Sequence, residues 1–240
     1  MDQRNCCVVI PTLNESESIK DLVEFFTFNG LYTIVVDDNS SDETRELAHY
    51  AGAYVIHNQE RKGLNRSLWQ GINLALDNDF DYVATVDAGR SHDPNHLFAM
   101  LELIDKHDLV IGSRFLPFSE YDNTKGKWYR PYLSQLAAKL CNLAQHDSNY
   151  TDWTSGYRIY RSSLLNSLKK FSYNAKMHPV QIEMLGRATQ LGAKVTEYPI
   201  SYIAGKTSFN KSVANEAFKI WLQLLNHYPA KPKYIESELV

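Results

Sequence analysis

The sequence predicts an α/β fold: a mostly parallel central sheet with helices on both faces. In the first half of the chain, short apolar runs alternate with stretches whose apolar residues recur at helical spacing. This alternation of strands and helices is typical of parallel sheets that helices cover on both sides. The chain has 240 residues, 44% of them hydrophobic and 22% charged, which suits one ordinary globular domain with a sizeable core.

Five buried strands are expected in the first half, and a helix follows each of the first four. The strands are predicted from the apolar runs at 6–10, 34–36, 53–56, 82–86 and 109–111. Asn14 and Ser40 each open a capping-box pattern and so predict the starts of the first two helices. Gly52 is expected to end the second helix, and Pro94 to start the fourth.

The second half is less regular. A long loop is expected first, and the remaining elements are predicted at 131–146 (helix), 159–160 (strand end), 178–191 (helix), 198–202 (edge strand) and 213–224 (helix). The loop at 115–130 is polar and aromatic, and loops of this length are often functional. The tail at 228–240 contains two prolines and is expected to be loose.

Composition excludes several classes of protein. A membrane-spanning helix needs about 20 consecutive apolar residues, and the chain has no such run. Its three cysteines have neither a disulfide framework nor metal-ligand spacing, so a reduced, cytoplasmic protein is expected. The net charge of -3 argues against generic nucleic-acid binding, which usually shows a basic footprint.

Polar residues gather just after the predicted strands, at 11–15, 37–40, 87–90 and 112–114. The carboxyl ends of parallel strands meet at one edge of a sheet, where ligands bind. A carboxylate at Asp87 can hold a divalent cation, which in turn can neutralise a diphosphate leaving group. Asp37 and Asp38 suit either a ligand contact or a turn. The strand ends therefore predict a binding site.

Taken in order, five segments resemble family 2 glycosyltransferases: 8–15, 35–42, 86–94, 111–115 and 154–161. The dolichol-phosphate mannose synthase-like branch, which comprises polyprenol-phosphate glycosyltransferases, is the most similar subgroup. Two further segments, Gln-Ile-Glu-Met-Leu at 181–185 and Glu-Tyr-Pro-Ile at 197–200, also match that branch. The resemblance extends from about residue 6 to about residue 225.

The resemblance implies a GT-A fold and an inverting glycosyltransferase that moves a sugar from a nucleoside-diphosphate sugar to a polyprenol-phosphate-like acceptor. It implies a divalent metal, magnesium or manganese. One GT-A domain is expected over 1–226, with a nucleotide-binding half at 1–114, an acceptor-side half at 115–226 and a tail at 227–240.

The same resemblance assigns roles to individual residues. Those expected to bind the donor are Pro11, Leu13, Glu15, Val36, Asp38, Arg130 and Lys206. Asp87 is expected to meet the metal or the diphosphate, and Arg114 to stabilise the phosphates. A hydroxyl acceptor would require a general base, for which Asp152 is the first candidate and Glu183 the second.

Two departures from the family pattern keep alternatives open. The Asp-x-Asp metal motif reads Asp87-Ala88-Gly89, so the second carboxylate is missing and a cation would be held more weakly. Ser91 and Asp93 are candidate replacements. The segment 203–208 lacks the family's arginine. The alternatives are transfer to a soluble acceptor (a glycan, a protein or a modified nucleic-acid base) and a non-catalytic nucleotide-sugar-binding protein.

The final predicted helix carries an apolar stripe that includes Phe218, Trp221, Leu222 and Leu225. Packing on the sheet or on a second subunit, as in a homodimer, is favoured for this stripe, because apolar helix stripes are usually core. Peripheral contact with a membrane or a lipid tail is the alternative.

Overall fold

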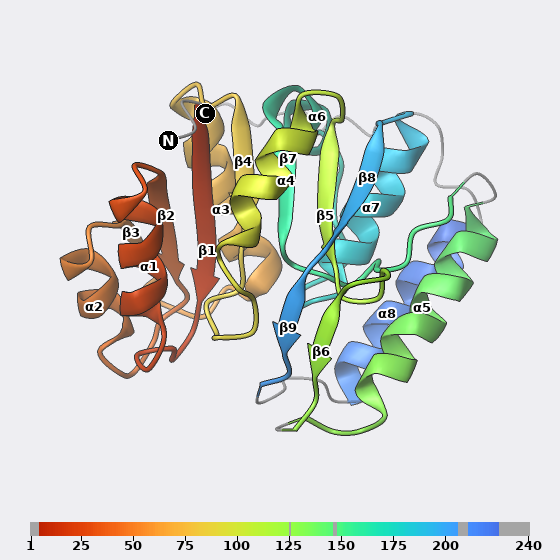
Figure 1. The fold of residues 1–240 in the computed structure, drawn as a ribbon, viewed down its shortest axis with the longest axis horizontal. Coiled ribbons are helices and arrows are strands. Elements are labelled where there is room, and N and C mark those ends of the chain that lie inside the picture. Colours follow the sequence, from red (N-terminus) through yellow and green to blue (C-terminus); the bar gives the residue numbers. More distant parts are fainter. Residues whose placement is uncertain (1–4, 125, 146–147, 206–210, 226–240) are drawn as a thin grey trace.

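A computed structural model describes residues 5–124, 126–145, 148–205 and 211–225 of the chain (Figure 1). Its central sheet has seven strands in the order β3-β2-β1-β4-β7-β5-β8. The strands are β1 (Cys6–Thr12), β2 (Tyr32–Asp37), β3 (Tyr54–His57), β4 (Tyr82–Thr85), β5 (Leu109–Ser113), β7 (Arg158–Arg161) and β8 (Val195–Pro199). All neighbours run parallel except β7, which lies antiparallel between β4 and β5. The predicted mostly parallel sheet is confirmed.

Helices cover both faces of this sheet, as predicted. One face carries α1 (Ile19–Phe28), α2 (Thr44–Tyr50) and α4 (His96–Ile104). The other carries α3 (Leu64–Asp77), α5 (Arg130–Ala144), α6 (Ser162–Leu168), α7 (Val180–Gln190) and α8 (Lys211–Leu225). Alternate residues of β1 enter the two cores, Val8 on one side and Val9 on the other. A small second sheet pairs β6 (Glu120–Asp122) with β9 (Ser201–Ile203).

Close packing of α3 on the sheet depends on Gly71. A Cβ atom added there would lie 2.4 Å from a Val9 methyl carbon and 3.1 Å from one of Val36. Since any side chain at position 71 would displace the helix, glycine sets the distance between α3 and strands β1 and β2.

Two predicted helix starts are wrong, for one shared reason. Helix α1 begins at Ile19 and α2 at Thr44, and neither has a side-chain N-cap hydrogen bond. The backbone N–H of Asn14 donates to Ser40 Oγ at 2.9 Å. These two residues therefore join two loops to each other instead of capping the helices that follow them. Gly52 has a φ of 95°, and the predicted end of α2 before it is confirmed.

The second half differs from its prediction in detail. The expected loop at 115–130 contains β6, and the expected edge strand divides at Ile200 into β8 and β9. Strand β8 does lie at the edge of the large sheet. Lys206 and the tail at 228–240 lie outside the described residues.

No helix within the described part of the chain is both long enough and apolar enough to cross a bilayer.

Candidate active site at the carboxyl edge of the sheet

Most of the predicted site residues that the structure describes come from one edge of the sheet. The carboxyl ends of β1, β2, β4 and β5 meet there, as they do in any parallel sheet. Because β7 is antiparallel, its amino end reaches the same edge and brings the preceding segment 151–157 with it. Residues from both halves of the chain therefore meet at this edge.

Hydrogen bonds join the loops that follow β1 and β2 into one rim. Asn14 Oδ1 accepts from the backbone N–H of Ser41 at 2.9 Å, and the N–H of Glu15 donates to Thr44 Oγ1 at 2.8 Å. Asn14 has a φ of 56°, a left-handed conformation that asparagine tolerates better than most residues. The rim fixes the main chain from which the Glu15 side chain extends.

Asp38 holds the loop before α3 in place. Its carboxylate accepts from the backbone N–H groups of Lys62 (2.8 Å) and Gly63 (2.9 Å) and from Asn58 Nδ2 (3.1 Å). Burial alone would raise the pKa of Asp38, but these hydrogen bonds outweigh it and lower the pKa below its usual value. Asp38 is therefore an ionised anchor.

The other residues predicted to surround the nucleoside differ in exposure. Leu13 is exposed on the rim and Pro11 is partly buried. Val36 is fully buried, and its side chain packs toward Gly71 in the core. Leu13 therefore presents a side chain at the edge, whereas Val36 does not.

Asp87 follows β4 and carries an open carboxylate. It is partly exposed and accepts no hydrogen bond from the described residues. A Cβ atom at Gly156 would lie 2.6 Å from Asp87 Oδ1, so the main chain of the 151–157 segment passes directly beside this carboxylate. Thr85 Oγ1 donates to the carbonyl of Gly156 at 2.8 Å and fixes that approach. Asp87 can accept a ligand without first losing a partner.

Glu15 is the second carboxylate with room for a ligand. Among the described residues, only Ser18 Oγ donates to it, at 3.3 Å. Burial raises the pKa of Glu15, and the negative charge of Asp87 raises it further, which places the two carboxylates within electrostatic reach of each other.

Arg114 and Asp152 form a buried ion pair. Arg114 donates from Nε to Asp152 Oδ2 at 2.7 Å and from Nη2 to Oδ1 at 2.8 Å. The guanidinium also lies over the rings of Phe115 and Tyr202, at 5.2 and 5.0 Å from their centroids. Burial would raise the pKa of Asp152, but the charge and hydrogen bonds of Arg114 lower it on balance. Asp152, the first candidate base, is therefore an ionised partner of Arg114.

Glu183 lies in the interior, away from solvent. It is fully buried, and its carboxylate accepts from the backbone N–H groups of Asn174 (3.0 Å) and Ala175 (3.1 Å). Arg158 is also fully buried and donates to the carbonyls of Gln181 (2.8 Å) and Trp153 (2.9 Å). These contacts tie α7 to the 151–157 segment and support the edge from behind.

His92 also lies at this edge, although it is not among the site residues predicted from the sequence. It is 6% exposed, and its ring centroid lies 5.2 Å from those of Tyr157 and Tyr202. Burial lowers its pKa to about 4, against the opposing effect of Asp87, so the ring is neutral near pH 7. Its place within the 86–94 motif, five residues after Asp87, was the available signal.

A hollow of about 480 Å³ continues from Arg114 toward the start of α5. Its aromatic lining includes Phe115, Tyr121, Trp128 and Tyr132. Arg130, at the first position of α5, donates from Nη1 to the carbonyl of Gly205 at 3.3 Å. Arg114 and Arg130, the two arginines predicted to contact phosphates, thus lie at or near this hollow.

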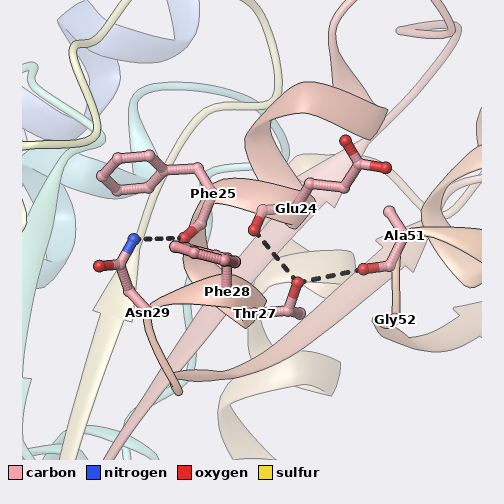
Figure 2. A pocket seen from close by; sticks show the side chains of 7 residues that line it. All are labelled: Glu24, Phe25, Thr27, Phe28, Asn29, Ala51 and Gly52. Carbon is pink, nitrogen blue, oxygen red and sulfur yellow. Dashed lines mark hydrogen bonds between the residues drawn. The ribbon is translucent and has the colours of Figure 1, made fainter.

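A second hollow, of about 830 Å³, lies far from these residues (Figure 2). The end of α1 and the segment before β3 line it, through Phe25, Phe28, Asn29 and Gly52 among others. Those segments precede β2 and β3 and so lie at the amino edge of the sheet. It contains none of the predicted site residues.

Comparison with known proteins agrees with this architecture. The model of the family "Glycosyl transferase family 2" matches residues 7–168. An undecaprenyl-phosphate mannosyltransferase from Micrococcus luteus is 30% identical over 224 residues, covering 87% of this chain and 89% of that protein. A polyprenol monophosphomannose synthase from Mycolicibacterium smegmatis is 30% identical over 217 residues, covering 85% of this chain and 79% of that protein.

Solved structures share the fold. Glucosyl-3-phosphoglycerate synthase from Mycobacterium tuberculosis, crystallised with Mn²⁺, uridine diphosphate and glucosyl-3-phosphoglycerate, superposes with a TM-score of 0.70 at 20% identity. The match covers 93% of this chain and 80% of that one. The same enzyme has also been crystallised with Mg²⁺ and uridine diphosphate. The family model, the relatives and the GT-A fold agree: the chain belongs to glycosyl transferase family 2 and is a glycosyltransferase.

Proposed function

We propose that the chain transfers a sugar, with inversion, from a nucleoside-diphosphate sugar to the phosphate of a polyprenyl-phosphate lipid. The open carboxylate of Asp87 carries this proposal. It stands at the carboxyl end of β4, while Asp38 and Asp152 are both occupied by hydrogen bonds. The names of the relatives from M. luteus and M. smegmatis support a polyprenyl-phosphate acceptor.

A divalent cation fits this donor set. Mg²⁺ is commonly bound by one or two carboxylates together with substrate phosphates. Among the described residues, Asp87 provides one carboxylate that accepts no hydrogen bond, and these residues contain no group of three metal-ligating side chains. A cation held at Asp87 would neutralise charge on the departing nucleoside diphosphate. Arg114, already oriented by Asp152, would stabilise the same charge through its Nη1 group.

A phosphate acceptor is favoured because neither candidate base is well placed to accept a proton. The pKa of Asp152 is lowered by Arg114, so its carboxylate is a weak proton acceptor, and Glu183 is enclosed by backbone donors. A hydroxyl acceptor would need such a base in the transition state. A phosphate monoester, whose second pKa is about 6, is already anionic near neutral pH. Its oxygen can attack the anomeric carbon directly, on the face opposite the leaving diphosphate.

An apolar face beside the hollow would bring the site to a membrane. We define the α5–α8 face by its exposed apolar residues, which are Tyr132, Leu133, Leu136, Leu140, Leu143, Phe218, Leu222 and Leu225. The two helices lie side by side (Figure 1), and Trp221 Nε1 of α8 donates to the Leu140 carbonyl of α5 at 3.0 Å. The sequence favours packing, on the sheet or on a second subunit, for the stripe that includes Phe218, Leu222 and Leu225. These residues do not pack on the sheet but are exposed, and Val213, Ile220 and Leu224 form the buried side of α8 instead.

The charges on this face also favour an anionic lipid surface. Helix α5 contains no acidic residue and exposes Lys139, and α8 exposes Lys219. The one acidic residue of α8, Glu216, accepts hydrogen bonds from the backbone N–H groups of Lys176 and Met177 and so turns toward that loop. Exposed apolar residues flanked by lysines are typical of segments that lie in a bilayer interface.

The two halves of the domain would bind different substrates. Residues 1–114 would bind the nucleotide, and residues 115–226 would supply the acceptor hollow and the α5–α8 face. The donor site would nevertheless include Gly156 from the second half, since its main chain lies beside Asp87.

The decisive experiment is a transfer assay with the purified chain. GDP-, UDP-, CDP- and dTDP-sugars, mannose donors included, are incubated with Mn²⁺ and with undecaprenyl phosphate in vesicles. We expect a glycosyl-phospholipid from one donor class. Transfer only to a soluble glycan, protein or nucleic-acid acceptor would overturn the lipid assignment. Binding of the donor without transfer to any acceptor would overturn the enzymatic one.

A further inference from the structure

Gly89 leaves an opening beside the Glu15 carboxylate. It stands two residues after Asp87, where the family motif has its second acid. A Cβ atom at Gly89 would lie 3.8 and 3.9 Å from the two carboxylate oxygens of Glu15, and 3.7 Å from Ser91 Oγ. These are ordinary contact distances, so the space that an acid at position 89 would enter borders the carboxylate of Glu15.

Glu15 is held firmly from its main chain, while its carboxylate is lightly occupied. Its N–H donates to Thr44 Oγ1 at 2.8 Å, and its carbonyl accepts from Ile19 at 3.0 Å. The carboxylate itself receives only the 3.3 Å hydrogen bond from Ser18 Oγ among the described residues.

Other nearby groups fit this role less well. Asp93 Oδ1 already accepts from the backbone N–H and the Nδ2 group of Asn95, at 2.9 and 2.8 Å. His92 is enclosed between the rings of Tyr157 and Tyr202. Glu15 is the acidic side chain whose carboxylate oxygens border the place of the missing acid.

We propose that Glu15 acts, together with Asp87, as the second carboxylate of the cation site, in place of the acid that is absent at Gly89. Two carboxylates leave most of the coordination shell to be completed by the diphosphate of the donor and by water. The cation and the nucleotide therefore bind together, and each tightens the other by the same factor. This inference rests on the proposed donor class, but not on the acceptor.

The test measures Mn²⁺ binding by the electron paramagnetic resonance signal of the free ion, with and without GDP or UDP. For the unaltered chain we expect at least tenfold tighter binding when the preferred nucleotide is present. Glu15→Gln should lose at least tenfold of that affinity. Glu17→Gln removes the same charge from an exposed neighbour and should change nothing. Equal binding by the Glu15→Gln variant and the unaltered chain would overturn the proposal.

If Glu15 contacted the nucleoside itself, Glu15→Gln would also weaken nucleotide binding. Nucleotide affinity is therefore measured again in EDTA, which removes the metal. We expect Glu15→Gln to leave metal-free affinity unchanged. An equal loss with and without the metal would overturn the role in cation binding.

Position 89 provides a gain-of-function arm. Gly89→Asp restores the missing acid and should bind Mn²⁺ at least tenfold tighter without nucleotide, whereas Gly89→Ala, which fits the same space, should not. No gain from Gly89→Asp in a variant that melts like the unaltered chain would count against the site. Both arms read binding alone, so a chain that binds the cation and nucleotide as expected but transfers no sugar would refute only the proposed function.

Discussion

The main chain of Gly156 lies against the carboxylate of Asp87, so closely that a Cβ atom there would stand 2.6 Å from Oδ1. These residues lie 69 positions apart in the sequence and meet because β7 inserts beside β4. Adding one methyl group at position 156 therefore tests how much activity depends on the placement of Asp87.

Gly156→Ala should displace the Asp87 carboxylate and lower kcat/KM by about 100-fold, since a shift of about 1 Å at a catalytic group can cost that much. Thermal unfolding of the same variant is the control, because it separates a local shift of Asp87 from a general loss of stability. Transfer at the unaltered rate by a variant that melts like the unaltered chain would contradict the proposed sensitivity at position 156.

Asp87→Asn keeps the shape of the side chain and removes its charge. We expect kcat to fall by about 100-fold or more, since the carboxylate would no longer support stabilisation of the leaving diphosphate. Its folding should be unaffected, because Asp87 accepts no hydrogen bond from the described residues. Transfer rates and thermal unfolding are measured together. Turnover at the unaltered rate would remove Asp87 from the mechanism.

Asp152→Asn should destabilise the fold. The change leaves the Arg114 guanidinium, only 9% exposed, without its ionised partner. Breaking a buried ion pair from one side costs about 3–5 kcal/mol, which urea unfolding would measure. Asp93→Asn, in an exposed loop, is the control and should cost little. A loss below about 1 kcal/mol would mean that the pair contributes little.

The same pair predicts a pH dependence of stability. The pKa of Asp152 is lower in the folded chain than its ordinary value, which is about 3.9 in model peptides. Its contribution is therefore fully present above that value and is lost as the pH falls toward the folded pKa. Urea unfolding between pH 5 and pH 2, an interval of about three units around that value, should show a shallower acid loss for Asp152→Asn than for the unaltered chain. Parallel curves would contradict this.

The α5–α8 face predicts membrane binding. Substituting Leu136 and Leu222 by Gln should reduce co-sedimentation with anionic vesicles by about tenfold or more. Burying the exposed surface of each leucine in the bilayer interface contributes about 1–2 kcal/mol to the free energy of binding. Phe28→Gln, an 87% exposed aromatic at the amino edge (Figure 2), should have no effect. Equal vesicle binding by the double variant would contradict the assignment, and a shift from dimer to monomer would identify a second copy as the occupant.

Sequence reasoning located the edge of the sheet because buried strands have a strong signal: apolar runs such as Cys6 to Ile10 end abruptly in polar residues. The prediction that Asn14 and Ser40 cap helices was wrong because these two residues bond to each other, 26 positions apart in the sequence. A capping pattern depends only on local spacing. Asp152 as a candidate base raises a similar problem. Its pKa depends on Arg114, 38 positions away, a partner that appears only when β5 and β7 pair.

The position of β7 also determines when the sheet can be completed as the chain emerges from the ribosome. The first 114 residues can pair only β3, β2, β1 and β4, because β5 reaches β4 through β7. Until residues 158–161 emerge, β4 is an open edge and Asp87 has no neighbouring main chain from Gly156. The proposed donor site would therefore be completed late during translation, and a nascent chain halted before β7 would display an unpaired strand edge of the kind that chaperones recognise.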